Sequence, residues 1–217
     1  YVVNQVCGSG IRSIASAYQS LKSGDSKIII AGGQESMSSA PHVIHLREGK
    51  KLGDTKLIDT MIKDGLWDAF HGYHMGITAE NVAEKFQITR DEQDKFALKS
   101  QEKALKAQKQ NKFNEEIINF KIKSKKAEID FDKDEHPREE ISLETLTRLK
   151  PVFKKDGTVT AGNASGINDG AAAVTLMSES EANKRDVKKL VSIKSWASCG
   201  VDPALMGTGP IPSSKKA

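Results

Sequence analysis

The stretch VVNQVCGSGIRSIASAYQSL, residues 2–21, decides the fold that we expect, because its pattern changes at Cys7. β-branched valines precede the cysteine, and after it apolar residues recur at helical spacing until Gly24 ends the run. These residues therefore predict a strand followed by a helix, with the cysteine at their junction. A second apolar strand at residues 27–31 would complete a parallel strand, helix, strand unit.

The position of Cys7 suggests a nucleophile. Unpaired N–H groups in the first turn of a helix carry partial positive charge, which favours a thiolate over a thiol. Gly8 and Gly10 lack a Cβ and would let an acyl group approach the sulfur. Free cysteines are also among the residues most often buried in protein cores. A purely structural Cys7 is therefore the alternative.

The same residues resemble a dinucleotide-binding fingerprint. GSGIRS, residues 8–13, approaches the pattern G-x-G-x-x-G, and Glu35 could imitate the acidic ribose ligand. Ser13 stands where the third glycine is needed for close packing of helix and strand. The match to this fingerprint is weak.

Composition describes a globular protein of 217 residues with room for one or two domains. Hydrophobic residues make up 37% and charged residues 29%, and no apolar run approaches the roughly 20 residues of a membrane span. The net charge of +4 does not indicate a nucleic-acid partner. Two cysteines, Cys7 and Cys199, argue for a reducing, cytoplasmic location, and we assign Cys199 to strand packing. Tyr1 opens within an apparent strand, so we expect a piece of a longer protein.

The middle of the chain has a different texture. The strand at residues 27–31 should end in a loop at Gly32 and Gly33, and helices should begin at Thr78 and at Thr89, which forms a capping box with Glu92. Short strands, an acidic turn and a small helix should follow. Six lysines on the second helix form either a solvated face, which we favour, or a polyanion surface: Lys95, Lys99, Lys103, Lys106, Lys109 and Lys112.

The scaffold resumes after a loop rich in Gly, Asn and Ser at residues 162–170. This loop lacks the Lys-Ser/Thr ending of a P-loop, and it suits an uncharged ligand with amide groups better than phosphate. Residues 171–177 should form a strand buried on both faces, with Ser178 and Glu181 capping the next helix. Residues 188–203 then predict another strand, and 207–217 the start of a helix.

Three motifs together resemble the thiolase family: NQVCGSG at residues 4–10, GYHMGITAEN at 72–81 and GNASGINDGAAA at 162–173. VDPALMGTGPIP at residues 201–212 agrees with them. The GYHMG form is similar to that of short-chain thiolases of the acetoacetyl-CoA type.

The resemblance implies an incomplete thiolase fold of class α/β, a layered α/β/α scaffold with a parallel-rich sheet. Residues 1–35 and 161–185 would belong to the N-terminal scaffold domain. Residues 36–160 would form an inserted α+β loop domain that binds coenzyme A, with a tetramerisation segment near 41–59. Residues 186–217 would begin the C-terminal domain.

The resemblance also implies an acyltransferase that condenses two acetyl-CoA reversibly to acetoacetyl-CoA and CoA through an acetyl-cysteine at Cys7. The Cys7 N–H would contribute to an oxyanion hole. We expect no metal, no cofactor beyond the coenzyme A of the substrate, no nucleic-acid or membrane partner, and a homodimer or homotetramer. The residues implied for substrate and coenzyme A binding are Leu66, His74, Met75, Arg138, Thr145, Phe153, Ala161, Ser165 and Met206.

The sequence departs from the family pattern in one respect. Thiolases also use N-E-A-F, G-H-P and C-x-G-G-G motifs, and none of these occurs in the 217 residues. We therefore expect little or no turnover from these residues alone. Two alternatives stay open, a degradative 3-ketoacyl-CoA thiolase acting on longer chains and a non-catalytic module that binds coenzyme A.

Overall fold

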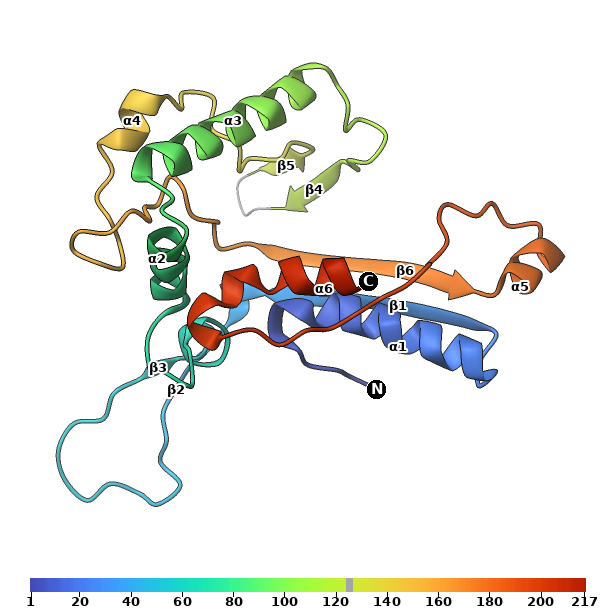
Figure 1. Cartoon of the computed structure of the whole chain (residues 1–217), viewed down its shortest axis with the longest axis horizontal. Helices are drawn as coiled ribbons and strands as arrows, with labels where there is room; N and C mark the ends of the chain where they lie inside the picture. The colour runs from blue at the N-terminus through green and yellow to red at the C-terminus, as the bar shows by residue number, and fades with distance from the viewer. Residues whose placement is uncertain (124–126) are drawn as a thin grey trace. The chain divides into compact units, whose positions relative to one another are not determined.

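The computed structural model describes residues 1–123 and 127–217, which divide into two compact units (Figure 1). The first unit comprises Tyr1–Thr78 with Gly166–Ala217, and the second comprises Ala79–Ser165. The predicted domain limits are not tested by this division, and they stay a prediction.

Helix α1, Ser9–Ser23, lies against strand β1, Ile28–Ser36, and this pair forms the centre of the first unit (Figure 1). The predicted helix is confirmed, and it ends at Gly24, whose φ of +83° is the left-handed conformation that glycine adopts without strain. A small core forms where the helix meets the sheet. Its buried residues are Ala17, Ala31 and Leu176, with Ile14, Leu21, Ile29 and Ile193 packed against them.

Helix and strand approach closely because small residues line both. A Cβ added to Gly33 would lie 3.1 Å from the Gly10 Cα, and Ser13 Oγ lies 2.7 Å from the carbonyl oxygen of Gly32. The Ser13 hydroxyl therefore donates a hydrogen bond to the strand from the position where the dinucleotide fingerprint requires glycine. That fingerprint also requires a strand before the helix, and residues 1–5 form none.

Strand pairing differs from the prediction in three respects. β1 continues through Gly32 and Gly33 to Ser36, and it pairs antiparallel with β6, Asp169–Met177, from Ile28 opposite Met177 to Ser36 opposite Asp169. The expected parallel unit with residues 2–6 is therefore wrong for the described residues. β6 is also not buried on both faces, because α1 lies along β1 and leaves most of β6 exposed.

The expected strand at residues 188–203 is also wrong. This segment has no strand assignment in the described structure, although Ile193 packs against the core. Cys199 is a half-buried free thiol outside any strand, so its assignment to strand packing is corrected as well. An apolar run forms a strand only where a neighbouring backbone is placed to pair with it.

The rest of the first unit is made of short elements. Two-residue strands β2, His42–Val43, and β3, Ile58–Asp59, pair antiparallel. The predicted Ser178 cap is confirmed, because its side chain accepts a hydrogen bond from the Glu181 N–H at 3.2 Å. The remaining elements are η1 Val6–Gly8, η2 Met37–Ser39, η3 Met61–Leu66, α5 Glu179–Lys184, η4 Pro203–Thr208 and α6 Pro210–Lys216, the last of which confirms the predicted final helix.

Helix α2, Met75–Lys85, begins in the first unit and continues into the second, three residues earlier than its predicted start at Thr78. The second unit also holds α3, Arg90–Lys109, which begins with the predicted capping box of Thr89 and Glu92. The hairpin of β4, Phe120–Lys123, and β5, Glu128–Phe131, and the short α4, Leu143–Thr147, confirm the strands and small helix expected there. Within the described part of the chain, no helix is long and apolar enough to cross a membrane.

Gly32→Ala should destabilise the first unit. The added Cβ would overlap the carbonyl oxygen of Ala172 and come within 2.9 Å of the Ala173 Cα, and both are backbone atoms of the paired strand. We expect the free energy of unfolding, measured by urea titration, to fall by about 1–3 kcal/mol. Gly170→Ala is the matched control on the same strand pair, because a Cβ there meets no atom within 4 Å. Equal stability of the two variants would contradict this account of the strand contact.

Candidate active site

Cys7 lies in a tight turn at the start of α1. Its side chain is exposed, within the short helix η1 that leads directly into α1. The preceding residue, Val6, has a φ of +48°, which is a rare conformation for a β-branched side chain. Strained backbone of this kind gathers at active sites, where the surrounding structure must hold it in place. The thiol is therefore presented to solvent by a turn that is not the strand end we predicted.

Side chains on both sides of the turn hold Val6 in this conformation. Asn4 Oδ1 accepts a hydrogen bond from the Val6 N–H at 2.9 Å. Ser9 Oγ accepts from the Gln5 N–H at 2.8 Å and donates to the Val6 carbonyl oxygen at 2.6 Å. The roles of these two polar residues were not predicted from the sequence, although Asn4 lies three positions before the cysteine and Ser9 two positions after it.

The start of α1 directly follows the short helix that holds the cysteine. The hydrogen bonds that close η1 run from the Gly8 N–H to the Gln5 carbonyl and from the Ser9 N–H to the Val6 carbonyl, so the Cys7 N–H takes part in neither. That N–H and the start of a 15-residue helix can stabilise negative charge near the sulfur. The geometry therefore places a backbone N–H donor, outside both closing bonds of η1, beside the exposed thiol.

The two glycines after Cys7 have different surroundings. A Cβ on Gly8 would touch only the Gln5 side chain, at 3.6 Å or more, which leaves the approach to the sulfur open. Gly10 instead faces the backbone of Gly33, so its lack of a side chain serves helix packing. We predicted an approach path at both glycines, and for Gly10 the contact with β1 corrects that reading.

His74 and Met75 lie at the start of α2, beside a tight turn formed by residues 67–74. His74 Nδ1 accepts a hydrogen bond from the Gly76 N–H at 3.0 Å, so the neutral ring carries its proton on Nε2. His74 also pairs with Trp67 in an isolated β-bridge. Trp67 directly follows Leu66, the last residue of η3. The turn thus brings the predicted residues Leu66, His74 and Met75 into one part of the first unit.

A buried carboxylate holds this turn. Asp68 is 5% exposed, and it accepts hydrogen bonds from the N–H groups of Phe70 at 3.0 Å and His71 at 3.2 Å. The His71 ring lies with Nδ1 2.6 Å from Asp68 Oδ2 and stacks on Tyr73. Burial by itself raises the pKa of Asp68, but these N–H groups and the His71 ring together hold the pKa below its ordinary value of 3.8.

Asp68→Asn should therefore destabilise the protein in a pH-dependent way. A carboxyl group whose pKa is lowered by folding stabilises the folded state above its ordinary value of 3.8, and this stabilisation is lost as the pH falls through the lowered pKa. We expect Asp68→Asn to lower Tm by a few degrees near neutral pH, with the difference narrowing below pH 3.8. Asp64→Asn, at an exposed position of η3, is the control and should leave Tm unchanged. A Tm difference that is constant across this pH range would contradict the account.

The other predicted residues fall into both units. Met206 is 41% exposed on η4 in the first unit. Arg138 is exposed in the second unit, where its N–H donates to Gln101 Oε1 at 3.0 Å. The hydroxyl of Thr145 takes part in the capping box of α4. Phe153, Ala161 and Ser165 lie on one irregular segment, residues 151–165.

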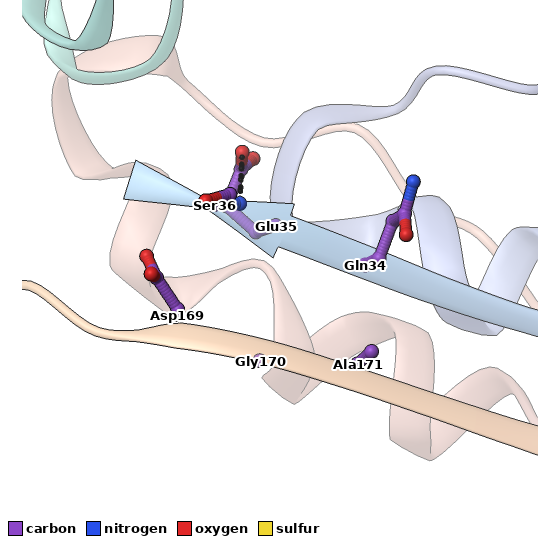
Figure 2. A pocket seen from close by; sticks show the side chains of 6 residues that line it. All are labelled: Gln34, Glu35, Ser36, Asp169, Gly170 and Ala171. Carbon is purple, nitrogen blue, oxygen red and sulfur yellow. Dashed lines mark hydrogen bonds between the residues drawn. The ribbon is translucent and has the colours of Figure 1, made fainter. Parts of the chain in front are cut away.

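A cavity of about 400 Å³ lies at the end of the β1 and β6 pair (Figure 2). None of the predicted binding residues lines it. Asp169 at its edge accepts hydrogen bonds from the hydroxyl and N–H of Ser38, which lower the pKa of its carboxyl group. This contact joins residues 131 positions apart, and no local sequence pattern indicates it. The cavity is lined by Gln34, Glu35, Ser36, Asp169, Gly170 and Ala171.

No group of three or more His, Cys, Asp or Glu side chains is placed to hold a metal ion in residues 1–123 and 127–217.

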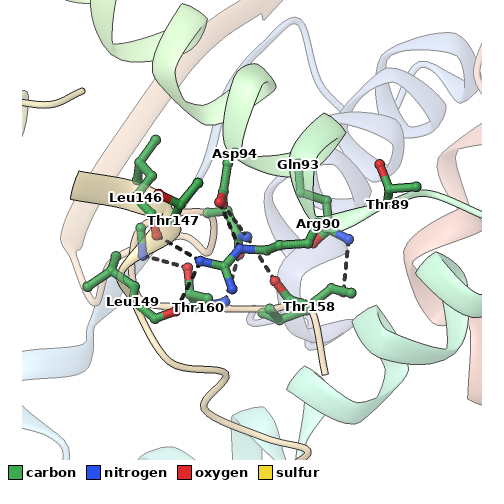
Figure 3. A network of polar contacts seen from close by, with 12 residues as sticks. Thr89, Arg90, Gln93, Asp94, Leu146, Thr147, Leu149, Thr158 and Thr160 are labelled. Atoms are coloured by element: carbon green, nitrogen blue, oxygen red, sulfur yellow. Dashed lines mark hydrogen bonds and ion pairs between the residues drawn. The ribbon is translucent and has the colours of Figure 1, made fainter. Parts of the chain in front are cut away.

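The polar network of the second unit was not predicted from the sequence. In this network Arg90 lies between Asp94 and the carbonyl groups of Leu146 and Leu149 (Figure 3).

Comparison with known proteins identifies the family. Residues 1–180 match the N-terminal domain of thiolase. The chain belongs to the thiolase family. It is 60% identical over 215 residues to an acetyl-CoA acetyltransferase of Rhizobium meliloti and 59% identical over 215 residues to one of Shinella zoogloeoides. Each match covers 99% of this chain and 55% of the relative, so the chain spans about half the length of these curated relatives.

Solved thiolase structures have the same fold. The crystal structure of the Bacillus anthracis acetyl-CoA acetyltransferase matches with a TM-score of 0.92 and 44% sequence identity, over 100% of this chain and 55% of the other. That of human mitochondrial 3-ketoacyl-CoA thiolase matches with a TM-score of 0.93 and 43% identity, over 99% and 55%. The thiolase fold that we expected is therefore confirmed for this chain, while the roles assigned to individual residues stay predictions.

Proposed function

We propose that the natural protein containing this chain transfers acetyl groups through Cys7, condensing two acetyl-CoA to acetoacetyl-CoA and free CoA. One observation carries the proposal: an exposed thiol on a strained turn at the start of α1, in a chain of the thiolase family. The names of the two relatives at 60% and 59% identity support acetyl-CoA as the substrate.

The first half-reaction needs a thiolate and a donor for the developing oxyanion. The Cys7 sulfur attacks the thioester carbonyl carbon of acetyl-CoA, and the carbon–sulfur bond to CoA breaks. The CoA thiolate leaves and takes up the proton that Cys7 released. The N–H of Cys7, outside both closing bonds of η1, can donate to the oxyanion.

In the second half-reaction a new acetyl-CoA loses a proton from its methyl carbon. That carbon attacks the acetyl carbonyl on Cys7, a carbon–carbon bond forms, and the cysteine leaves as thiolate. The proton needs a base, and the G-H-P and C-x-G-G-G motifs that supply further catalytic groups in the family do not occur in these 217 residues. For the chain alone the proposal therefore includes Cys7 and part of the coenzyme A site, with little or no turnover.

Coenzyme A would bind through the residues that the resemblance to the family implies. On the pattern of the family, Leu66, His74, Met75 and Met206 would line the pantetheine channel, and Ser165 would donate a hydrogen bond to pantetheine. The exposed guanidinium of Arg138 can pair with a phosphate or cover the adenine ring, and Thr145, Phe153 and Ala161 belong to the same unit.

A cytoplasmic location, a homodimer or homotetramer, and the absence of any cofactor besides coenzyme A on the substrate are further parts of this proposal. Two free thiols support the reducing location. Exposed apolar side chains at residues 41–59, which include Ile44, Leu46, Leu52 and Leu57, support the contact between subunits.

Cys7→Ala should abolish formation of the acetyl-enzyme. We expect acetoacetyl-CoA synthesis by the natural protein to fall by at least about a thousandfold, because the acyl group then has no acceptor. The measurements are the rate and the mass of the protein after incubation with acetyl-CoA. Cys199→Ala removes the other thiol of these 217 residues and should keep both the rate and the added acetyl group. Turnover of Cys7→Ala at the parental rate would refute the assignment.

Chain length separates the proposal from its closest alternative. The similarity to the human 3-ketoacyl-CoA thiolase, at 43% identity, keeps a degradative enzyme for longer chains as the second candidate. We expect kcat/KM for thiolysis to be at least about tenfold higher for acetoacetyl-CoA than for a 3-ketoacyl-CoA of sixteen or so carbons. The reverse order would favour the degradative enzyme. A Cys7 that resists iodoacetamide would favour the non-catalytic module.

A further inference from the structure

Two carboxylates of the second unit are buried although the proposed chemistry uses neither. Glu80 on α2 is 4% exposed, and Asp94 on α3 is fully buried. Buried charge is costly unless hydrogen bonds and ion pairs compensate it. The hydrogen-bond partners of these two carboxylates therefore indicate which part of the structure the buried charges stabilise.

Two consecutive residues, Thr158 and Val159, donate hydrogen bonds to the Glu80 carboxylate. Glu80 Oε1 and Oε2 both lie 2.9 Å from the Thr158 N–H, and Oε1 also accepts from the Val159 N–H at 2.8 Å. Oε2 accepts from the Thr158 hydroxyl at 2.9 Å. One carboxylate thus orders the backbone at the beginning of a loop that lies 78 residues away in sequence.

Asp94 reaches the same loop through an amide side chain. Its Oδ2 accepts from Arg90 Nε at 2.8 Å, and its Oδ1 accepts from Asn163 Nδ2 at 3.0 Å. Asn163 Nδ2 also donates to the Thr158 carbonyl at 3.0 Å, while Asn163 Oδ1 accepts from the Thr160 N–H at 2.8 Å. The Asn163 amide group therefore connects Asp94 to the backbone of Thr158 and Thr160.

Arg90 joins this network to α4. Its Nη2 donates to the carbonyl oxygens of Leu146 at 2.7 Å and Leu149 at 3.0 Å (Figure 3). The Leu146 and Leu149 side chains pack against Gly162 of the loop, because a Cβ added to Gly162 would overlap Leu146 and lie 2.6 Å from Leu149 Cδ1. The segment at residues 158–163 is fixed by hydrogen bonds and by packing.

The fixed segment carries residues that the proposed function needs. Ala161 lies inside it, and Ser165 follows Asn163 by two positions. The Val152 N–H donates to the Val159 carbonyl at 3.0 Å, which ties the residue before Phe153 to the same segment. Replacing buried ions by apolar side chains is often neutral or stabilising, so two such carboxylates aimed at one loop favour a conformational role over a general stabilising one.

We propose that Glu80, Asp94 and Asn163 are positioning residues, which hold residues 151–165 in the conformation that receives the coenzyme A of the acyl-CoA substrate. The proposal rests on the proposed function, since it takes Phe153, Ala161 and Ser165 as contacts of coenzyme A. None of the three positioning residues touches the reacting atoms in this proposal.

The proposal predicts a change in affinity. If a variant loop occupies the competent conformation about a tenth of the time, the apparent Kd for CoA rises about tenfold. We expect this in Glu80→Gln, Asp94→Asn and Asn163→Ala, with a matching rise in KM for acetyl-CoA and a kcat within about twofold of the parent. A purely structural role would instead lower the fraction of active protein, which reduces kcat and leaves KM unchanged.

The experiment measures Kd for CoA by calorimetry and KM for acetyl-CoA and for acetyl-pantetheine, on the natural protein. Because Phe153 is assigned to the adenosine end, the parental preference for acetyl-CoA over acetyl-pantetheine should shrink in the variants. Asp91→Asn is the matched control, since Asp91 is also on α3 but forms an exposed ion pair with Lys95 and should leave all values unchanged.

Thr158→Val keeps the inference falsifiable if the carboxylate variants do not fold. This nearly isosteric change removes the hydroxyl that donates to Glu80 Oε2 and accepts from Gln93 Nε2 at 2.9 Å, and it should raise Kd and KM by about twofold to threefold. Unchanged Kd and KM in the folded variants would overturn the positioning role. A parent that binds CoA but never acetylates Cys7 would overturn the proposed function, while the Kd values still decide the positioning role. A parent that does not bind CoA would overturn both.

Discussion

The close approach of α1 to β1 is the contact on which the geometry around Cys7 depends. Gly10 and Gly33 meet backbone to backbone, and the Ser13 hydroxyl donates to the Gly32 carbonyl one turn further along the helix. A larger side chain at this contact would push the start of the helix away from the strand. Because η1 leads directly into α1, the position of the thiol follows from this contact.

Features that depend on neighbouring residues could be predicted from the sequence. The end of α1 at Gly24 and the capping box of Thr89 and Glu92 are local, since each is a matter of one backbone conformation or of two side chains a turn apart. The thiolase fold could be predicted because several motifs agreed in register along the chain. The place of Cys7 before a helix was also correct, although the residues ahead of it form a strained turn and no strand.

Features that join distant residues could not be predicted in this way. The pairing of Ile28 with Met177 depends on two backbones 149 positions apart, and a valine-rich or alanine-rich run does not specify its partner or its direction. The sequence likewise did not indicate the hydrogen bonds between Glu80 and Thr158, because Glu80 has the pattern of an ordinary carboxylate on a helix. At the candidate site, the motifs supplied the residues, whereas the side chains that hold them, such as Asn4 and Asp68, became visible only in the structure.

The left-handed backbone of Val6 has a consequence for how this protein can change. A glycine at that position would adopt the same φ without strain, so the backbone strain of the folded state at this residue would be relieved. The same replacement would give the peptide beside the sulfur many more accessible orientations. Relief of the strain at Val6 would therefore be achieved only with a less defined orientation of the Cys7 sulfur. Selection for heat tolerance alone would act against the turn that presents the thiol.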